Sequence, residues 1–350
     1  MRKNLLLLVT IILLGVYSCK NDTAEFPDFD YTTTYFPYQY PVRTLVLGDY
    51  IYDNSNDNNL KFKISAHIGG LLDNKKDWTA TYQFDPTLVT KLATAPNLFD
   101  GKTVNSADTL KILPSEYYTL NPVNQFVVPA GKFIGEIEVQ LTEAFLNDPD
   151  AVLTRYVLPL RIVTSTTDSV LVGRAAVSFP DPRVAKDWIN VPKDYTIFGI
   201  KYVNAFHGKY LHRGRSVITD NVPTVLDTII YRTKYVESNE VWSLQTVGRN
   251  KVRVTGTLRK NPSSPGNFAI DLTFDANNDC VVTNVDGSAF QVTGTGKFVK
   301  NGDIWGNVPQ NAIYLNYVVT EGINKHTITD TLVFRDKAVT FLEYQPVILP

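Results

Sequence analysis

The side chains of this chain that could do chemistry are few and scattered. The four histidines are His67, His207, His212 and His326, and only His207 and His212 lie close together in the sequence. Five positions separate these two, and an odd separation along a strand places two side chains on opposite faces. This spacing predicts hydrogen-bonded or surface histidines and not zinc ligands.

Acidic residues are plentiful, but none stands in a recognisable catalytic motif. A glycosidase needs two carboxylates held about 5 to 10 Å apart, and the G-x-S-x-G motif of many serine hydrolases is missing from this sequence. The oxygen-rich runs 53–59 and 275–279 lack the glycine and terminal glutamate of an EF-hand loop. They predict solvated turns, with calcium binding as the alternative. We therefore expect no enzyme activity, no catalytic residue, no metal site and no cofactor.

Aromatic residues are the remaining chemical clue, with 19 tyrosines, 18 phenylalanines and 4 tryptophans. A flat ring with a polar tip can cover the C–H face of a sugar and stay wettable. Trp78 stands in an alternating apolar row and is predicted to be core, whereas Trp242 follows polar residues at a strand end and Trp305 lies in a turn-rich segment. We predict a ligand-binding role for Trp242, Trp305, Tyr210, His212 and Arg213. Replacing Trp242 or Trp305 by alanine is expected to weaken glycan retention without unfolding the protein.

The first 18 residues read as a secretory signal peptide. Arg2 and Lys3 precede an apolar run from Leu5 to Leu14, which is shorter than the roughly 20 residues that a membrane-spanning helix needs. Cys19 directly follows a small residue, as in a bacterial lipoprotein cleavage box. This resemblance implies that Cys19 becomes the acylated first residue of the mature protein, and that residues 19–30 form a polar stalk.

Composition narrows the remaining possibilities. The formal net charge is −1, and no basic run is present, so nucleic acid is not an expected partner. With Cys19 acylated, Cys280 is the only other cysteine, so no disulfide can form within the chain. We expect Cys280 to be a small buried hydrophobe.

Hydrophobic alternation with a period of two predicts an all-β protein. Alternating runs recur at 60–68, 78–84 and 133–141, and segments 155–163 and 170–179 predict a hairpin. Only 86–93, after Asp85, is predicted to be helical. Two prolines at 180 and 182 predict a boundary between domains 31–182 and 183–350. About eight or nine strands in the second half predict an up-and-down barrel, with a second sandwich as the alternative.

Several segments resemble known families. The Tyr35–Leu45, Leu113–Tyr118, Val127–Gly131 and Gly135–Val139 segments resemble the Bacteroidetes lipoprotein domain DUF1735 over roughly residues 30–180. The Gly294–Phe298, Trp305–Asn307 and Asp330–Asp336 segments resemble the DUF5627 or lipocalin-like domain that accompanies it. The resemblance implies an N-terminal Ig-like β-sandwich followed by a C-terminal antiparallel lipocalin-like β-barrel.

The same resemblance implies a function in polysaccharide utilisation. We expect a non-catalytic surface lipoprotein of a Gram-negative bacterium, anchored in the outer membrane by its lipid and exposed at the cell surface. Its expected ligand is an oligo- or polysaccharide, and its expected neighbours are glycan-degrading enzymes and importers. Two alternatives stay open at this point: a lipocalin-like carrier of an apolar small molecule, and a structural or adhesin-like surface protein.

Overall fold

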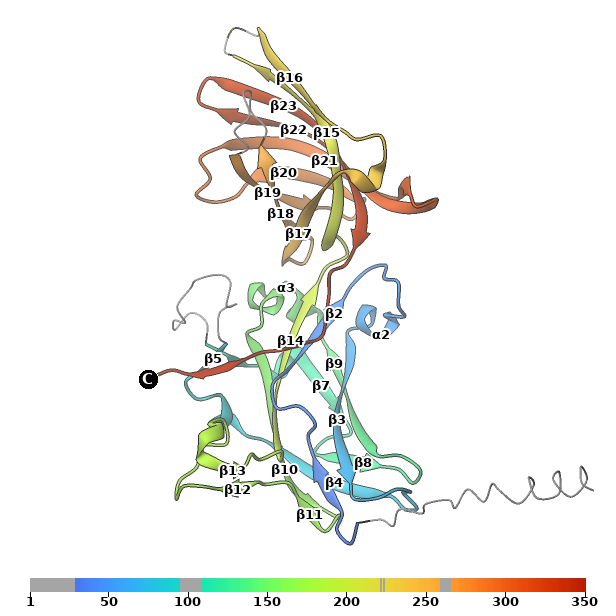
Figure 1. Cartoon of the computed structure of the whole chain (residues 1–350), viewed down its shortest axis with the longest axis vertical. Coiled ribbons are helices and arrows are strands. Elements are labelled where there is room, and N and C mark those ends of the chain that lie inside the picture. The colour runs from blue at the N-terminus through green and yellow to red at the C-terminus, as the bar shows by residue number, and fades with distance from the viewer. Residues whose placement is uncertain (1–28, 95–108, 221, 223, 259–265) are drawn as a thin grey trace, which may run out of the picture.

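A computed structural model describes residues 29–94, 109–220, 222, 224–258 and 266–350. Figure 1 shows two β-rich bodies, one above the other along the longest axis of the molecule. The lower body is built mainly from the N-terminal half, and the upper body is a barrel. The predicted all-β architecture is confirmed.

The N-terminal domain consists of two sheets packed face to face. The first has the strand order β11 (Ser169–Val170), β1 (Thr33–Tyr35), β3 (Lys61–Gly69), β9 (Ile134–Leu141) and β7 (Tyr118–Asn121). The second has the order β24 (Leu342–Glu343), β2 (Pro41–Val46), β14 (Tyr195–Val203), β10 (Tyr156–Ser165), β4 (Trp78–Phe84) and β8 (Gln125–Val128), with β6 (Lys111–Ile112) beside β10.

Alternation of apolar and polar residues places one face of each sheet in the core. Phe62, Ile64 and Ala66 of β3 are buried, whereas the alternating Lys61 and Lys63 point outward and pair with Glu138 and Glu136 of β9. Trp78 is also buried, as predicted. Three strand pairs of this domain are parallel, namely β2 with β14, β1 with β11 and β6 with β10.

The C-terminal domain is a closed barrel of eight antiparallel strands. In order these are β15 (Gly208–Thr219), β17 (Glu240–Gly248), β18 (Lys251–Leu258), β19 (Gly266–Phe274), β20 (Asp279–Asn284), β21 (Gln291–Trp305), β22 (Val308–Glu321) and β23 (Asn324–Asp336), which returns to β15. A further strand, β16 (Val225–Tyr231), pairs with the second half of β15. Cys280 points into the barrel core and is buried, as predicted.

The chain crosses between the two domains twice. After the prolines at 180 and 182 it first adds β14 to the N-terminal sheet, and the barrel begins only at Gly208. After β23 it returns, where β24 pairs with β2 and β25 (Pro346–Ile348) pairs with β5 (Leu92–Thr94). The strands therefore change from sandwich to barrel about 25 residues later than the proline pair indicates, since hydrogen bonding to β2 and β10 recruits β14.

Some local predictions need correction. Segment 86–93 forms only the 3₁₀ turn η1 (Pro86–Val89), which Asp85 caps by accepting from the Thr87 N–H, and β5 follows. The predicted hairpin at 155–179 is wrong, because β11 leaves β10 and pairs with β1 in the other sheet. The remaining short elements are α2 (Ser55–Asn58), α3 (Glu143–Asn147), η3 (Ser115–Tyr117), η4 (Pro149–Val152), β12 (Arg174–Ala175), η5 (Ala185–Asp187), β13 (Trp188–Asn190) and η6 (Val236–Ser238).

Candidate functional site

Two neighbouring cavities lie where the loop after β2 meets the segment after β23. The first has a volume of about 410 Å³, and its lining includes β2, the loop residues Tyr50, Asp53 and Asn54, and residues 339–341. The second has a volume of about 520 Å³ and is lined by residues 49–52, 309–311 and 334–339. Tyr50 and Val339 line both cavities. We call the two together the junction groove, because the first belongs to the sandwich and the second reaches the barrel.

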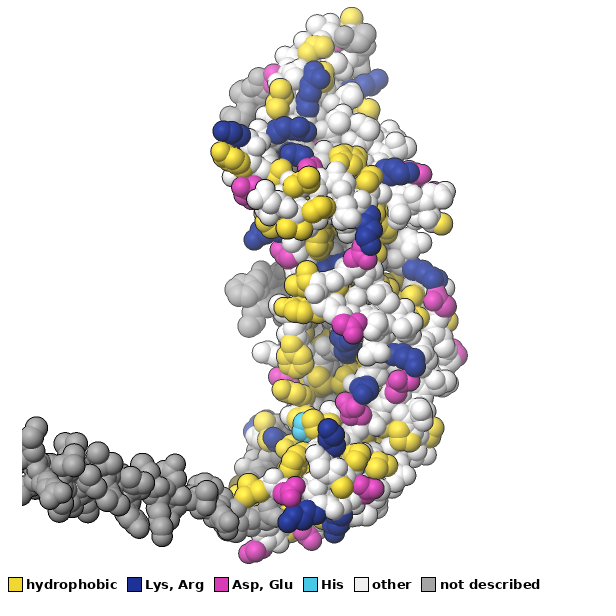
Figure 2. All heavy atoms as spheres, turned by 90° about the vertical axis from the view of Figure 1, so that its right-hand side faces the viewer, with side chains coloured by type: hydrophobic (Ala, Val, Ile, Leu, Met, Phe, Trp, Pro, Cys, Tyr) yellow, Lys and Arg dark blue, Asp and Glu magenta, His cyan; other side chains and the backbone are white. Residues whose placement is uncertain are grey.

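Aromatic rings line the junction groove. Tyr38 and Phe341 flank the first cavity with ring centroids 5.4 Å apart, and the Phe341 side chain is 66% exposed. Tyr50 and Tyr52 flank the second in an edge-to-face arrangement at 5.5 Å, and Tyr52 is 68% exposed. Figure 2 shows hydrophobic side chains interrupting the polar surface between the two domains on the face that it views. The groove therefore offers flat apolar surfaces that water already reaches.

A buried carboxylate forms the polar wall of the first cavity. Asp57 is only 4% exposed, yet it accepts from the Arg43 guanidinium and, at 2.9 Å, from the Val46 N–H. Charge pairing and the backbone donor make this burial tolerable. The Arg43 side chain remains 38% exposed, so some of its N–H groups are available to a ligand in the groove.

The sequence at 53–59 forms this wall by local hydrogen bonds. The Asn54 amide donates to the carbonyls of Val46 and Gly48 at 2.7 Å, and the Gly48 N–H donates to Asn58 at 2.8 Å. The segment thereby forms the single helical turn α2 against the end of β2, so the predicted solvated turn is wrong in its central residue Asp57. The Ser55 backbone N–H donates to Asp53 and lowers the pKa of that carboxyl.

Lys337 closes the barrel end of the groove. Its side chain is almost fully buried, and the ammonium donates to the carbonyl of Ala205 at 2.7 Å and to those of Asn204 at 3.3 Å and Leu47 at 3.4 Å. Burial lowers the pKa of Lys337 to about 8. Because Leu47 belongs to the sandwich and Lys337 follows β23, this cation fixes the two walls of the second cavity relative to each other.

Three of the five residues predicted to bind ligand lie inside the barrel. Tyr210, His212 and Trp242 are all buried, and the His212 ring stacks on Trp242 with centroids 3.4 Å apart. The prediction that Trp242 lies near solvent is wrong, because β17 turns this residue inward, where the ring packs on Gly256 of β18. The buried Trp242 ring therefore does not offer the exposed sugar-binding surface that the prediction requires.

His212 lies between two carboxylates. Its Nδ1 is 2.6 Å from Glu240 and its Nε2 is 3.1 Å from Asp330. Asp330 also accepts from the hydroxyls of Tyr231 at 2.5 Å and Tyr317 at 2.7 Å. Burial opposes the charged imidazolium, but the contacts with Asp330 and Glu240 outweigh it and raise the pKa of His212. This arrangement is an ion cluster, buried at His212 and Asp330, that links β15 to its two neighbouring strands β17 and β23.

Trp305 and Arg213 lie outside the barrel interior. The half-buried Trp305 donates its indole N–H to the carbonyl of Phe334 at 2.9 Å, and Phe334 lines the second cavity. Arg213 forms an ion pair with Asp303 on the extension of β21. Neither Trp305 nor Arg213 lines the groove itself.

Sequence patterns did not identify the groove residues, because the loop after β2 belongs to no alternating row and contains no known motif. Tyr50 and Tyr52 stand on either side of Ile51, directly before the polar run 53–59. An apolar triplet outside any alternating row, next to turn residues, is a signal for an exposed aromatic loop. Phe341 lies some 290 positions further along the chain, and only the returning C-terminal segment brings it beside Tyr38.

Two searches of the described residues bear on ligand and location. No group of three or more histidine, cysteine, aspartate or glutamate side chains there is arranged to hold a metal ion. Within the same part of the chain, no helix is long and apolar enough to cross a membrane.

Comparisons with known proteins agree with this two-domain architecture. A family model for an N-terminal domain matches residues 29–169, and the model for DUF5627, a domain of unknown function, matches residues 205–338. A crystal structure of a structural-genomics protein of unknown function from Bacteroides ovatus is 30% identical, with a TM-score of 0.82, and the alignment covers 92% of this chain and 100% of that one. No curated protein matches the sequence.

Two further solved structures match at lower similarity. A multidomain protein including DUF1735 from Bacteroides ovatus is 12% identical with a TM-score of 0.45, covering 89% of this chain and 97% of that one. An auxiliary nutrient binding protein from Bacteroides thetaiotaomicron is 13% identical with a TM-score of 0.39, covering 84% and 90%.

The fold and the comparisons define a class: two-domain proteins with a β-sandwich before a closed eight-stranded barrel. Within this class, the chain belongs to the family of the 30% identical Bacteroides ovatus protein, and the two family models match its N-terminal domain and its DUF5627 C-terminal domain. The family assignment made from the sequence is confirmed.

Proposed function

We propose that this protein is a non-catalytic lipoprotein of the outer membrane that binds an oligo- or polysaccharide in the junction groove. The acylated Cys19 holds it at the cell surface, and bound glycan is presented to neighbouring glycan-degrading enzymes and importers. The observation that carries the proposal is the pairing of rings along one groove, Tyr38 with Phe341 and the half-buried Tyr50 with Tyr52, of which Tyr38, Tyr52 and Phe341 are exposed.

The chemistry of the groove suits a carbohydrate. Rings with one wet face cover the C–H surface of a pyranose, and the tyrosine hydroxyls remain free to bond at its edge. Arg43, Asp53 and Asn54 line the first cavity together with Tyr38, Tyr50 and Phe341. A ligand rich in hydroxyls can bond to the donors and acceptors that these groups still turn to water, whereas a purely apolar ligand would displace that water without replacing its hydrogen bonds.

The two alternative functions are less well supported by the described residues. A carrier of an apolar molecule calls for a dry cavity with aliphatic walls, but the described barrel interior holds the ion cluster of His212, Glu240 and Asp330 beside packed aromatic rings. An adhesin calls for a contiguous apolar patch without a pocket, and the junction groove is a pocket of mixed polarity.

The test begins with a glycan array on the chain from residue 20 onward, followed by affinity electrophoresis on a polysaccharide that it retains. Tyr52→Ala and Phe341→Ala are each expected to weaken retention about fivefold to tenfold, since one aromatic contact is worth about 1 kcal/mol. Tyr235→Ala is the matched control, because Tyr235 is an exposed tyrosine outside the groove. Unchanged retention in both groove variants would contradict the assignment of the site.

Two further measurements address the rest of the proposal. Release of reducing ends from the retained polysaccharide by the purified protein alone would contradict a non-catalytic role. Mass spectrometry of the native protein is expected to find acyl chains on the peptide that begins with Cys19. A native chain with free Cys19 would contradict the anchor and leave the groove assignment intact.

A further inference from the structure

A projecting segment of the N-terminal domain exposes more apolar side chains than a free surface favours. This segment, residues 171–193, contains β12, η5 and β13, and we call it the arm. Its exposed hydrophobic residues are Val172, Val177, Phe179, Ile189 and Val191. Phe179 is 95% exposed. A gathering of this kind marks an interaction surface.

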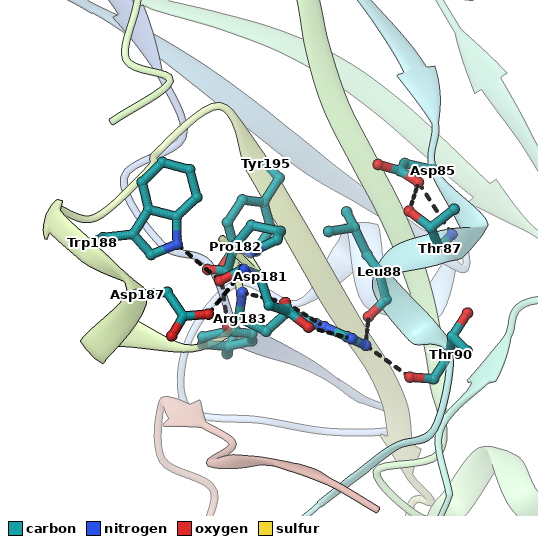
Figure 3. Close-up of polar contacts among 11 residues, drawn as sticks. Asp85, Thr87, Leu88, Thr90, Asp181, Pro182, Arg183, Asp187, Trp188 and Tyr195 are labelled. Carbon is teal, nitrogen blue, oxygen red and sulfur yellow. Dashed lines mark hydrogen bonds and ion pairs between the residues drawn. The ribbon is translucent and has the colours of Figure 1, made fainter. Parts of the chain in front are cut away.

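Hydrogen bonds and an ion pair fix the arm in place, so the exposure of its apolar side chains does not result from loose packing. Arg183 pairs with Asp181 at 2.7 Å and donates to the carbonyls of Leu88 at 3.1 Å and Thr90 at 2.8 Å. The Trp188 indole N–H donates to the Asp181 carbonyl at 2.8 Å. Figure 3 shows Arg183 reaching from the arm to the turn that carries Leu88 and Thr90.

The base of the arm is fixed as well. The Lys193 N–H donates to the Leu171 carbonyl at 2.7 Å, and the Tyr195 hydroxyl donates to the Pro182 carbonyl at 2.8 Å. Val172, Ile189 and Val191 line one shallow hollow together with Arg174 and Lys193. The hollow therefore combines apolar side chains with two basic ones.

The arm lies at the end of the molecule where the described chain begins. Ser169, which also lines the hollow, donates its backbone N–H to the carbonyl of Thr32 at 3.2 Å. Figure 1 shows β11, β12 and β13 at the end of the N-terminal domain farthest from the barrel. Ten residues separate Cys19 from Phe29, and they span at most about 35 Å. A lipid on Cys19 thus keeps this end of the molecule close to the membrane.

We propose that the arm rests on the membrane surface, with Phe179 and the apolar hollow entering the headgroup region and the basic side chains facing anionic lipid. Arg174 and Lys186 are exposed on the arm, and Lys193 lies at the hollow. Each such charge strengthens binding to an anionic surface roughly fivefold. This placement rests on the acylation of Cys19 in the proposed function, and it directs the barrel and the junction groove away from the membrane.

The test uses a fluorescent probe at the arm. The chain from residue 20 carries a histidine tag at its N-terminus in place of the acylated Cys19. The tag tethers it to vesicles of phosphatidylcholine and phosphatidylglycerol that contain a nickel-chelating lipid. Phe179→Cys is labelled with an environment-sensitive dye, and Ile230→Cys on β16 of the barrel, which is 68% exposed in the parent chain, is the control. Cys280 is buried and stays unlabelled. We expect a blue shift and quenching by spin-labelled acyl chains at position 179 only.

A second measurement tests how much Phe179 contributes to the affinity for the membrane. Without tag or acyl chain, Phe179→Asp is expected to lower partitioning onto the same vesicles about tenfold, part of what full burial of a phenylalanine is worth. A probe at 179 that stays in a water-like environment, or equal partitioning of the parent and Phe179→Asp, overturns the proposal and leaves a protein partner as the occupant of the arm. Because the tether replaces the acyl chain and the groove is untouched, these outcomes are independent of lipidation and of glycan binding.

Discussion

Replacing His212 by leucine is expected to destabilise the barrel and to remove a pH dependence from its stability. Leucine preserves much of the volume beside Trp242 but leaves the Asp330 carboxylate, which is buried, without its cation. Removing one partner of a buried ion pair costs about 3 to 5 kcal/mol. The hydroxyls of Tyr231 and Tyr317 still bond to Asp330, so the lower half of this range is expected. For a domain of this size, that corresponds to a fall of roughly 10 °C in Tm.

The sign of the pH dependence follows from the raised pKa of His212. The folded state holds the proton more tightly than the unfolded state, whose histidine has a pKa of about 6.5. The stabilisation is therefore complete below about pH 6.5 and is lost as the pH rises through the folded-state pKa. The His212→Leu variant lacks this contribution at every pH, so its difference from the parent chain should be larger at low pH than at high pH.

The measurement is thermal unfolding followed by near-UV circular dichroism on either side of this window. A double-mutant cycle with Asp330→Asn isolates the pair, and the double variant is expected to be more stable than the sum of the single losses indicates. Equal destabilisation by His212→Leu across the pH range, or additive losses in the cycle, would refute the view that a charged His212 balances Asp330.

Two other predictions concern the junction and the barrel core. Because burial lowers the pKa of Lys337 to about 8, the folded state loses this proton at a lower pH than the unfolded state does. The free energy of unfolding therefore increases as the pH rises from about 8 toward 10.5. Chemical unfolding curves of Lys337→Met should lack this increase, and an unchanged increase would contradict the prediction. A Cβ on Gly256 would lie 2.3 Å from the Trp242 ring, so Gly256→Ala should lower the stability of the protein by about 1 to 3 kcal/mol in thermal unfolding. Gly248→Ala is the control and should lower it less, because the nearest atom to its Cβ would be 3.5 Å away. Equal losses of stability would show that the Trp242 ring moves to make room.

Much of the fold was predictable because it depends on local alternation. The row Phe62, Ile64 and Ala66 could face the core only as a strand. The barrel was equally readable, since successive strands with hairpin-length turns pair with their neighbours. The parallel pairing of β14 with β2 was not predictable, because it joins segments some 150 residues apart and depends on how the two sheets close.

The candidate site shows the same division. The sequence identifies residue types that suit a sugar, but it does not show whether their side chains face solvent or the barrel interior. Trp242 and His212 alternate into the barrel, where they are buried and where His212 pairs with Asp330. Tyr52 and Phe341 face the groove because the C-terminal segment returns past the loop after β2. Their proximity is a property of chain return, and no local pattern encodes it.

The sequence by itself determined the strand pattern, the two-domain order and the buried state of Trp78 and Cys280, since each follows from residue type and short-range spacing, while the family followed from the resemblance of whole segments. The tertiary structure alone decided which aromatics stay exposed, that Asp57 is buried beside Arg43, and that Lys337 joins the two domains. The physical reason is that burial and charge pairing depend on which distant segments meet, and that choice is made by the packing of the whole chain.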